Sequence, residues 1–358
     1  MTAFLLLSTI VIWAMAATVA GWLACVFPAV FRKAFVWAAP VCVTSFILFG
    51  IAYTRAHYQG AAHVLYYAAY ILFGFLFLAF CTTLFFTALY FLMKFLHPPF
   101  LHFIGSASVA VMLIVFILSL WGGFSSPKVK RIPLQIDGMP SIKIAVLSDA
   151  HLGMGVSFAR FDKAMERLEA EKPDVLLAVG DIFEYGPHRE QYAARIKQVQ
   201  TPLGTYGVLG NHEYYVGYGD SKDFYRDAGI TLLENTSAVL PNGVQVAGVK
   251  DIHTVRVLPA EVTALVGGLA QDKPIILLSH TPLYAEEASK AGADLMLSGH
   301  THNGQLYPFN YLVRLQFPRV YGLFKVGGMP FYITSGLFYW GIPLRFLAPA
   351  EIPIIEVN

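Results

Sequence analysis

Hydrophobic residues follow two contrasting patterns along this chain. The first part holds four long, nearly uncharged apolar runs, each long enough for the roughly 20-residue helix that crosses a hydrocarbon core of about 30 Å. These runs cover about residues 4–31, 34–54, 64–93 and 103–124. Farther along, short apolar runs alternate with amphipathic segments and polar turns. We therefore expect a transmembrane region of about four helices over residues 1–125, a linker over 126–141 and a folded domain over 142–358.

Basic side chains and prolines mark the breaks between the four apolar runs. They are Arg32 and Lys33, then Arg55, then Lys94 with Pro98 and Pro99. A cleaved signal peptide would need a basic start and a single short apolar region. This chain instead starts "MTAFLLLSTI" and continues with three further long runs. We expect an integral, multi-pass membrane protein rather than a signal peptide or buried core helices.

Basic residues between the expected spans give a small orientation signal. With four spans, the N-terminal side carries Arg55, Lys128, Lys130 and Arg131, and the opposite side carries Arg32, Lys33 and Lys94. Cytoplasmic loops of membrane proteins carry the excess of Lys and Arg. Four against three leans toward a C-terminal domain on the cytoplasmic side.

Charge is concentrated in the second part of the chain. All 23 acidic residues lie at or after Asp137, together with 18 of the 25 Lys and Arg, so this part carries a net charge of −5. Nucleic-acid binding needs clustered basic charge on a folded surface, which this balance does not provide. The cysteines, Cys25, Cys42 and Cys81, all lie in the apolar part. We expect neither a nucleic-acid partner nor thiol chemistry at the site.

Five strand-like runs in the second part each end at a polar side chain. The runs are "IKIAVLSD", "DVLLAVGD", "YGVLGNHE", "IILLSH" and "LMLSGHTH", which lead to Asp149, Asp181, Asn211, His280 and His300. A helix is expected from about Ser157, where apolar residues recur at spacings of three and four. Because ligands gather outside the carboxyl ends of strands in α/β sheets, these side chains should meet at one edge. Carboxylate, imidazole and amide oxygen suit borderline divalent metals such as Mn, Fe and Zn.

Each of these short motifs has a simpler explanation when taken alone. An Asp-x-His or a histidine pair is more often structural than metal-binding, and a Gly-Asp pair after a strand is most often a turn. The occurrence of two carboxylates, four histidines and an asparagine at successive strand ends is what predicts a metal site.

The same residues resemble a known family. "DAH" at 149–151, "GDIFE" at 180–184, "GNHE" at 210–213, "SHTP" at 279–282 and "GHTH" at 299–302 resemble the five blocks of the calcineurin-like metallophosphoesterases. The tail further resembles the bacterial membrane-associated branch that includes YkuE and YaeI. The resemblance covers about Ile142 to Asn358. It implies an α/β domain built as a two-sheet αββα sandwich behind the transmembrane helical bundle, and two divalent metal ions of the type Mn, Fe or Zn.

The resemblance also implies how the ligands divide between the two metals. The first metal would be held by Asp149, His151, Asp181 and His302, and the second would share Asp181 and take Asn211, His280 and His300. A metal-bound hydroxide would attack phosphorus. His212 would not be a ligand; we expect it to stabilise phosphoryl charge or protonate the leaving oxygen, oriented by Glu213 or a nearby carboxylate. The alternative is that His212 only holds the site in position.

Two residues depart from the family pattern without removing a ligand. Glu184 stands where Asp is commoner in the block, and Asn303 stands where this branch often has Gly. Asn303 puts the local turn shape in question, and with it the substrate preference.

The segment after the last histidines bears on the substrate. No acidic residue lies between Asp294 and Glu351, and "YPFNYLVRLQFPRVYGLF" combines aromatic and basic side chains. Such a segment can rest on lipid headgroups. Packing is the alternative, because aromatic and β-branched residues also fill sheet cores and "VGGMPFYI" predicts a hairpin.

Three functions remain open on this basis. The first is an integral-membrane phosphoesterase acting on a phosphodiester, phosphomonoester or pyrophosphate bond of a lipid-linked substrate, such as a phospholipid or a nucleotide-linked lipid; the resemblance extends to UDP-diacylglucosamine pyrophosphatases. The second is a membrane-anchored phosphodiesterase for a soluble substrate such as a cyclic nucleotide. The third is a non-catalytic metal-binding receptor or transporter scaffold, which the filled ligand positions and the absence of acidic residues in the spans disfavour.

Overall fold

A computed structural model describes residues 2–31, 33–57, 60–94 and 101–358, and the chain divides into two compact units. The first unit comprises Met1–Phe124 with Gly341–Phe346, and the second comprises Ser125–Trp340 with Leu347–Asn358. The chain therefore returns briefly to the first unit late in the sequence. Arg32, Pro98 and Pro99, which mark breaks between the apolar runs, lie outside the described residues.

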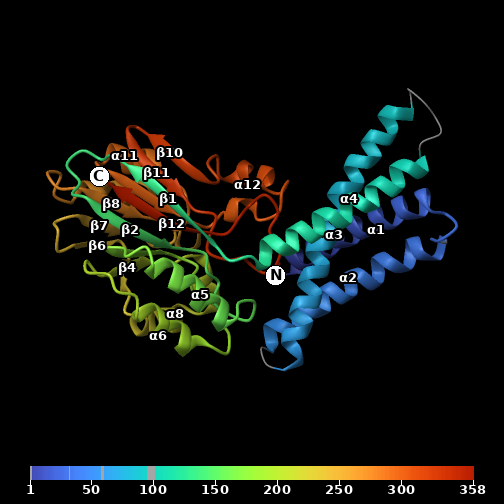
Figure 1. The fold of residues 1–358 in the computed structure, drawn as a ribbon, viewed down its shortest axis with the longest axis horizontal. Helices are drawn as coiled ribbons and strands as arrows, with labels where there is room; N and C mark the ends of the chain where they lie inside the picture. The colour runs from blue at the N-terminus through green and yellow to red at the C-terminus, as the bar shows by residue number, and fades with distance from the viewer. Residues whose placement is uncertain (1, 32, 58–59, 95–100) are drawn as a thin grey trace. The chain divides into compact units, whose positions relative to one another are not determined.

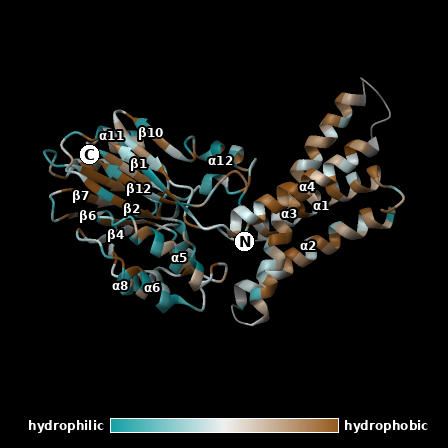
Figure 2. Ribbon diagram, in the orientation of Figure 1, coloured by the Kyte–Doolittle hydropathy of each residue, from teal (hydrophilic) through white to brown (hydrophobic). Residues whose placement is uncertain are grey.

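The first unit contains four long helices (Figure 1). They are α1 (Thr2–Val26), α2 (Lys33–Ala56), α3 (Ala61–Lys94) and α4 (Leu101–Phe124). All four are long and apolar enough to cross a membrane, which confirms the four predicted apolar helices. Only 22–39% of the residues in their apolar windows are buried. Most of these residues are therefore at least partly exposed, although the helices are mainly apolar, as their brown colour in Figure 2 shows. Lipid is the environment that suits such a surface.

A buried hydrogen bond between two helices and several glycines contribute to the close packing inside the first unit. The indole of Trp22 donates to Ser108 Oγ at 2.9 Å, joining α1 to α4. The late segment Gly341–Phe346 lies against α3 and α4. A Cβ on Gly122 would clash with the backbone oxygen of Arg345, and a Cβ on Gly123 with that of Pro343. These glycines are needed because helix and segment approach backbone to backbone.

The second unit is a mixed α/β domain. Its strands are β1 (Lys128–Leu134), β2 (Ile142–Leu147), β3 (Val175–Val179), β4 (Thr205–Val208), β5 (Thr231–Leu232), β6 (Thr236–Val239), β7 (Gln245–Gly248), β8 (Ile275–Leu278), β9 (Leu295–Ser298), β10 (Gly322–Val326), β11 (Met329–Ile333) and β12 (Glu351–Val357). Its helices are α5 (Phe158–Glu169), α6 (Arg189–Lys197), α7 (Asn211–Val216), α8 (Tyr218–Asp227), α9 (Ile252–Val255), α10 (Pro259–Gly267), α11 (Ala285–Lys290) and α12 (Asn310–Gln316), with a 3-10 turn at His302–Gly304.

These strands form two six-stranded sheets. Their orders are β1-β12-β2-β3-β4-β5 and β10-β11-β9-β8-β7-β6. The five predicted strand runs are confirmed as β2, β3, β4, β8 and β9, and the predicted hairpin is β10 with β11. The expected linker over 126–141 differs: Lys128–Leu134 forms β1, which pairs in parallel with β12 along its whole length. Its alternating burial at Ile132 and Leu134 explains why, since both side chains enter the core between the sheets.

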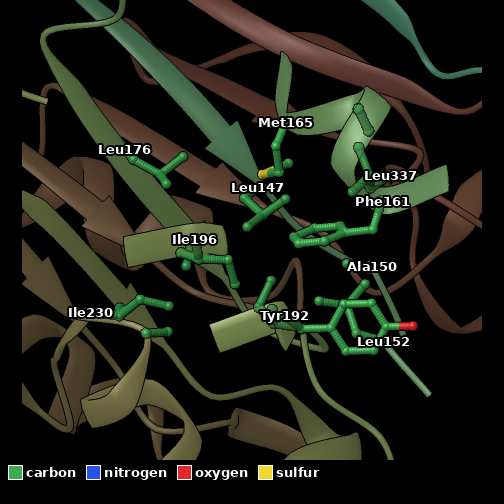
Figure 3. Packing of buried hydrophobic residues seen from close by; sticks show 14 of the residues in the cluster. Leu147, Ala150, Leu152, Phe161, Met165, Leu176, Tyr192, Ile196, Ile230 and Leu337 are labelled. Carbon is green, nitrogen blue, oxygen red and sulfur yellow. The ribbon is translucent and has the colours of Figure 1, made fainter. Parts of the chain in front are cut away.

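Apolar side chains of the central strands alternate between the two faces of each sheet, so both faces are covered and the domain has four layers. In β2, Ile144 and Val146 pack into the core between the sheets, whereas Ala145 and Leu147 face the opposite side. That opposite side is covered by α5 and α6, where Phe161 and its neighbours pack on Leu147 (Figure 3). The other sheet is covered on its outer face by residues of α10 and α11. The two-sheet αββα arrangement is therefore confirmed.

Candidate metal centre

Each predicted ligand lies shortly after the end of a strand, in a loop or at the start of the next helical turn. Asp149 and His151 follow β2, Asp181 follows β3, Asn211 follows β4 and begins α7, His280 follows β8, and His300 and His302 follow β9. The left-handed backbone occurs at five of them, with φ of 51° for Asp149, 44° for His151, 54° for Asp181, 72° for His300 and 48° for His302. Non-glycine residues rarely adopt this conformation, and where they do they concentrate at functional sites.

A first cluster joins Asp149, His151 and His302. Nε2 of His302 lies 3.3 Å from Oδ1 of Asp149 and 3.0 Å from Nε2 of His151. All three side chains are buried. Asp149 also accepts a hydrogen bond from Ser148 Oγ at 2.6 Å and one from the backbone N–H of His300 at 3.0 Å. These contacts bring together three of the four residues predicted to hold the first metal.

A second cluster joins Asp181, His280 and His300. Nε2 of His280 lies 3.1 Å from Oδ2 of Asp181 and 3.3 Å from Nδ1 of His300. The same Oδ2 atom of Asp181 lies 3.9 Å from Nε2 of His151 in the first cluster. Asp181 therefore stands between the two clusters, which is the position that a carboxylate shared by two ions requires.

Two of the imidazoles are oriented by a partner on the nitrogen that faces away from the clusters. Nδ1 of His280 lies 2.8 Å from the carbonyl oxygen of Val179, and Nδ1 of His151 lies 2.7 Å from Oε1 of Glu184. Because a carbonyl or carboxylate only accepts, each Nδ1 is the donor. With its proton on Nδ1, such a ring can present the Nε2 lone pair to a metal ion, as metal-binding histidines do.

Asn211 provides a direct test of whether these side chains fit metal ions. Its Oδ1 atom is buried and has no hydrogen-bond partner among the residues that the structure describes. A buried acceptor without a partner is costly unless it binds something. Four pairs of donor atoms within the clusters are also 3.0–3.3 Å apart, close to the spacing of roughly 3.0–3.4 Å for two ligands each about 2.1 Å from one ion. The donor set fits two divalent ions.

Two glycines allow the loops to approach each other at the centre. A Cβ on Gly299 would clash with the carboxylate of Asp149, and a Cβ on Gly210 would clash with that of Asp181. Because Gly299 has no side chain, the loop after β9 can approach the carboxylate of Asp149, which follows β2 of the other sheet.

His212 lies beside the first cluster. Its Nδ1 is 2.9 Å from Oε1 of Glu184, the oxygen that also contacts His151, and its backbone N–H donates to Asp181 at 2.8 Å. Loss of hydration lowers the pKa of His212, but the charges of Asp181 and Glu184 outweigh it and raise the pKa to about 9. Burial raises the pKa of Glu184, but hydrogen bonds from the two histidines lower it to about 2.

Glu184 is a residue of the candidate site to which the sequence analysis gave no role, and it contacts both His151 and His212. It was noticed only as a departure from the family pattern, yet it is the carboxylate that orients His212. Glu213, the other candidate, accepts backbone N–H bonds from Gly210, Asp181, Ile182 and Phe183 instead. It therefore fastens the loop after β3 to the start of α7. Burial, and then the charge of Asp181, raise the pKa of Glu213 to about 7.

Two exposed aromatic side chains flank His212. The rings of Tyr215 and Trp340 each meet its ring edge to face, with centroids 5.4 Å away, and they are 66% and 53% exposed. Trp340 is fixed by Gln305, whose side chain accepts from the Trp340 N–H at 2.8 Å and donates to its carbonyl at 3.2 Å. Both positions lay outside the motifs, so only the folded chain reveals them.

The backbone of Asn303 explains how this departure from the family pattern fits the turn. Its φ of 53° and ψ of 32° lie in the left-handed region. Glycine enters this region freely, and asparagine is among the few other residues that tolerate it. The turn that carries His302 is therefore compatible with either residue.

Comparison with known proteins identifies the family. Residues 142–304 match the family model described as calcineurin-like phosphoesterase. An uncharacterized metallophosphoesterase of Campylobacter jejuni is 33% identical over 256 residues, covering 69% of this chain and 68% of that protein. The chain belongs to the calcineurin-like metallophosphoesterases. Membership supports hydrolysis of phosphoester bonds by this chain, and the family normally binds two divalent metals.

Two further relatives of this metallophosphoesterase connect it to membranes and to the predicted branch. A zebrafish (Danio rerio) protein named transmembrane protein with metallophosphoesterase domain is 31% identical over 274 residues, covering 70% of this chain and 62% of that protein. YkuE of Bacillus subtilis, an uncharacterized metallophosphoesterase, is 28% identical over 244 residues, covering 64% of this chain and 83% of YkuE. Together with the four apolar helices, these matches support a membrane location.

Proposed function

We propose that this metallophosphoesterase is a multi-pass membrane enzyme that hydrolyses a phosphoester or pyrophosphate bond in a lipid-linked substrate at a dinuclear centre. The proposal of two metal ions rests on one observation. Oδ2 of Asp181 lies 3.1 Å from Nε2 of His280 and 3.9 Å from Nε2 of His151, so one carboxylate contacts both clusters. Asp149, His151, Asp181 and His302 would hold one ion, and Asp181, Asn211, His280 and His300 the other.

Two divalent ions, when bound, would supply an activated water and a positive field for the phosphoryl oxygens. The chain's own groups would perform the remaining tasks. Asp181 and Glu184 raise the pKa of His212, which favours its protonated form near neutral pH. Since its Nδ1 is committed to Glu184, its Nε2 is the nitrogen that can hold a proton for the leaving oxygen. Glu184 positions both His151 and His212 through one oxygen atom.

A lipid-linked substrate is supported by the surroundings of His212. The exposed rings of Tyr215 and Trp340 offer an apolar surface beside the leaving-group position. The chain from residue 295 to 350 contains no acidic side chain that would repel a phosphate group. The four apolar helices keep the enzyme at a bilayer, where such substrates reside.

The test compares two substrates for the same protein. Detergent-solubilised enzyme with Mn would be given a phosphorylated lipid extract and, separately, a soluble bis-aryl phosphodiester. Asp181→Asn is the blank, and Asp272→Asn, which alters an exposed aspartate, is the matched control. We expect faster turnover of the lipid than of the soluble ester. Turnover of the soluble ester alone would favour the membrane-anchored phosphodiesterase, and turnover of neither would favour a non-catalytic scaffold.

We also propose that the catalytic unit lies on the cytoplasmic side, as the count of basic residues between the spans suggests. Protease treatment of sealed inside-out and right-side-out vesicles tests this. Cleavage within residues 125–340 only in inside-out vesicles is expected, and cleavage only in right-side-out vesicles would reverse the orientation.

A further inference from the structure

Helix α12 is unusual within the second unit because none of its residues is buried. Tyr311, Leu312 and Leu315 are 53%, 57% and 84% exposed. Leu315 follows Tyr311 by four positions and Leu312 by three, so the three side chains share one face of the helix. A soluble surface rarely keeps large apolar side chains grouped in this way, and such groups mark sites of interaction.

Both ends of α12 are attached to the turn that carries His300 and His302. Before the helix, a Cβ on Gly304 would lie 2.5 Å from Cα of Asn310, so the turn and the helix start are in direct backbone contact. After the helix, the buried ring of Phe317 meets the ring of His300 edge to face at 5.1 Å. Whatever covers the exposed face of α12 would therefore be held in a fixed relation to two predicted metal ligands.

The charged residues near α12 indicate what kind of partner could cover its exposed face. Arg314 lies within the helix, with its guanidinium over the Tyr311 ring at 5.8 Å. Arg319 follows it, although Glu286 pairs with that side chain at 2.7 Å. Aromatic and aliphatic side chains beside Arg, with no acidic residue from 295 to 350, match the interface of a bilayer with anionic headgroups.

Chain connectivity also favours a bilayer. Gln305, two residues before Tyr307, holds both backbone groups of Trp340. The next residue in the chain, Gly341, belongs to the helical unit, where its carbonyl accepts from Tyr66 of α3 at 2.7 Å. The chain therefore passes from Trp340, which is bonded to Gln305 in the loop before α12, directly into a segment of the apolar helical unit.

We propose that the face formed by Tyr311, Leu312 and Leu315 docks on the surface of an anionic lipid bilayer and so presents the metal centre to phosphate groups at the headgroup level. The docking itself is independent of the reaction. Its consequence for catalysis rests on the proposed function.

The docking is tested by lipid quenching of a fluorophore. The full chain, with Cys25, Cys42 and Cys81 replaced by Ala, would carry Leu315→Cys labelled with an environment-sensitive dye, in nanodiscs of phosphatidylcholine and phosphatidylglycerol. Leu258→Cys is the matched control, because Leu258 is also an exposed leucine of the second unit, at 61%. Lipid spin-labelled near the headgroup should quench the dye at position 315 and not at 258. Equal quenching, or none at 315, would overturn the docking.

The catalytic consequence is tested separately with Leu312→Ser/Leu315→Ser in the natural cysteine background. Loss of two leucines from a lipid contact should lower turnover of a bilayer-embedded phospholipid by about tenfold. Turnover of the soluble bis-aryl phosphodiester should stay unchanged, which shows that the metal centre is intact. Quenching at 315 without any phosphoester turnover would retain the docking and reject the proposed function. Equal loss on both substrates would reject presentation by α12.

Discussion

Ile144 in β2 is fully buried, whereas Ile117 in α4 is 62% exposed, although both lie in apolar runs. The second unit places such side chains between its sheets and beneath its helices. The first unit turns most of them outward and keeps only small internal clusters, such as that of Trp22 and Phe86. The two units therefore depend on different surroundings: packed protein stabilises one, and lipid completes the other.

Polar groups differ between the units in the same way. Hydroxyls of the first unit bond mostly to their own helix, as Thr82 does to the carbonyl of Leu78 at 2.8 Å. The second unit instead gathers carboxylates and imidazoles from several loops at one place. A bilayer tolerates hydroxyls that bond within the helix, while a metal centre needs unlike elements to converge. Substitutions in the two units should therefore impair the protein in different ways.

The largest effect is expected at the centre of the second unit. Asp181→Asn removes the charge that both clusters share, so it should release bound metal and lower hydrolysis at least about 1,000-fold. Metal analysis of the purified protein beside a turnover assay measures this. Membrane extraction and helix content should match the unaltered protein. Full metal occupancy in this variant would contradict a shared carboxylate.

His212→Ala is expected to separate chemistry from metal binding. The variant should retain its metals and lose about 10²- to 10⁴-fold in rate, the usual range for a positioned acid. The measurement is again metal content with kcat. Loss of metal would mean that His212 holds the site together, and an unchanged rate would remove it from the reaction.

Glu184→Gln should have an intermediate effect. The amide keeps the size of the side chain but weakens the hydrogen bonds to His151 and His212, so metal affinity or rate should fall about 10- to 100-fold. The pKa of His212 should also fall toward its ordinary value, which NMR of the ring can follow. Glu190→Gln, on the first turn of α6, is a control that should change neither quantity.

Replacing an isoleucine by alanine should lower stability by unequal amounts in the two units. Ile144→Ala leaves a cavity between the sheets and should lower the free energy of unfolding by about 2–5 kcal/mol. Ile117→Ala removes atoms from a surface that lipid or detergent refills, so the change should stay within about 0.5 kcal/mol. Thermal unfolding in one detergent compares them. Similar losses would mean that the outer face of α4 is packed against protein.

The smallest effect is expected within the membrane unit. Ser108→Ala removes the acceptor of the Trp22 indole, and hydrogen bonds between membrane helices contribute about 0.6 kcal/mol on average. Thr18→Val is the control, because its hydroxyl bonds to Ala14 of its own helix. Unfolding in mixed micelles should distinguish the two. A loss of several kcal/mol at Ser108 would show that polar contacts, rather than apolar packing, hold this unit.

Much of the site was predictable because its residues sit at the ends of strands whose apolar runs are unambiguous. Asp149, Asp181 and His280 each follow such a run, and the fold brings them together. Glu184 was not assigned, because no local pattern shows that one carboxylate oxygen can reach histidines from two separate loops. The spacing of apolar residues along the sequence predicts which face of an element a side chain occupies. Only the folded chain shows which residue that side chain contacts.

The fold was predictable to a similar extent and for similar reasons. The four apolar helices and the five strands follow from length and periodicity. Strand β1 was missed because "KVKRIPL" carries three basic residues and a proline, which read as a linker. Its pairing with β12 joins residues more than 200 positions apart, and the local sequence of neither strand predicts this pairing. The return of Gly341–Phe346 to the helical unit was invisible for the same reason.

That return has a consequence for how the protein is made. Helices α1 to α4 leave the ribosome first, yet Gly341 follows Phe124 by 217 positions. During vectorial synthesis Gly122 and Gly123 therefore lack their native backbone contacts until the catalytic unit has been translated. The membrane part of the nascent chain can be inserted early, but it reaches its native packing only when a segment from beyond the metal centre arrives.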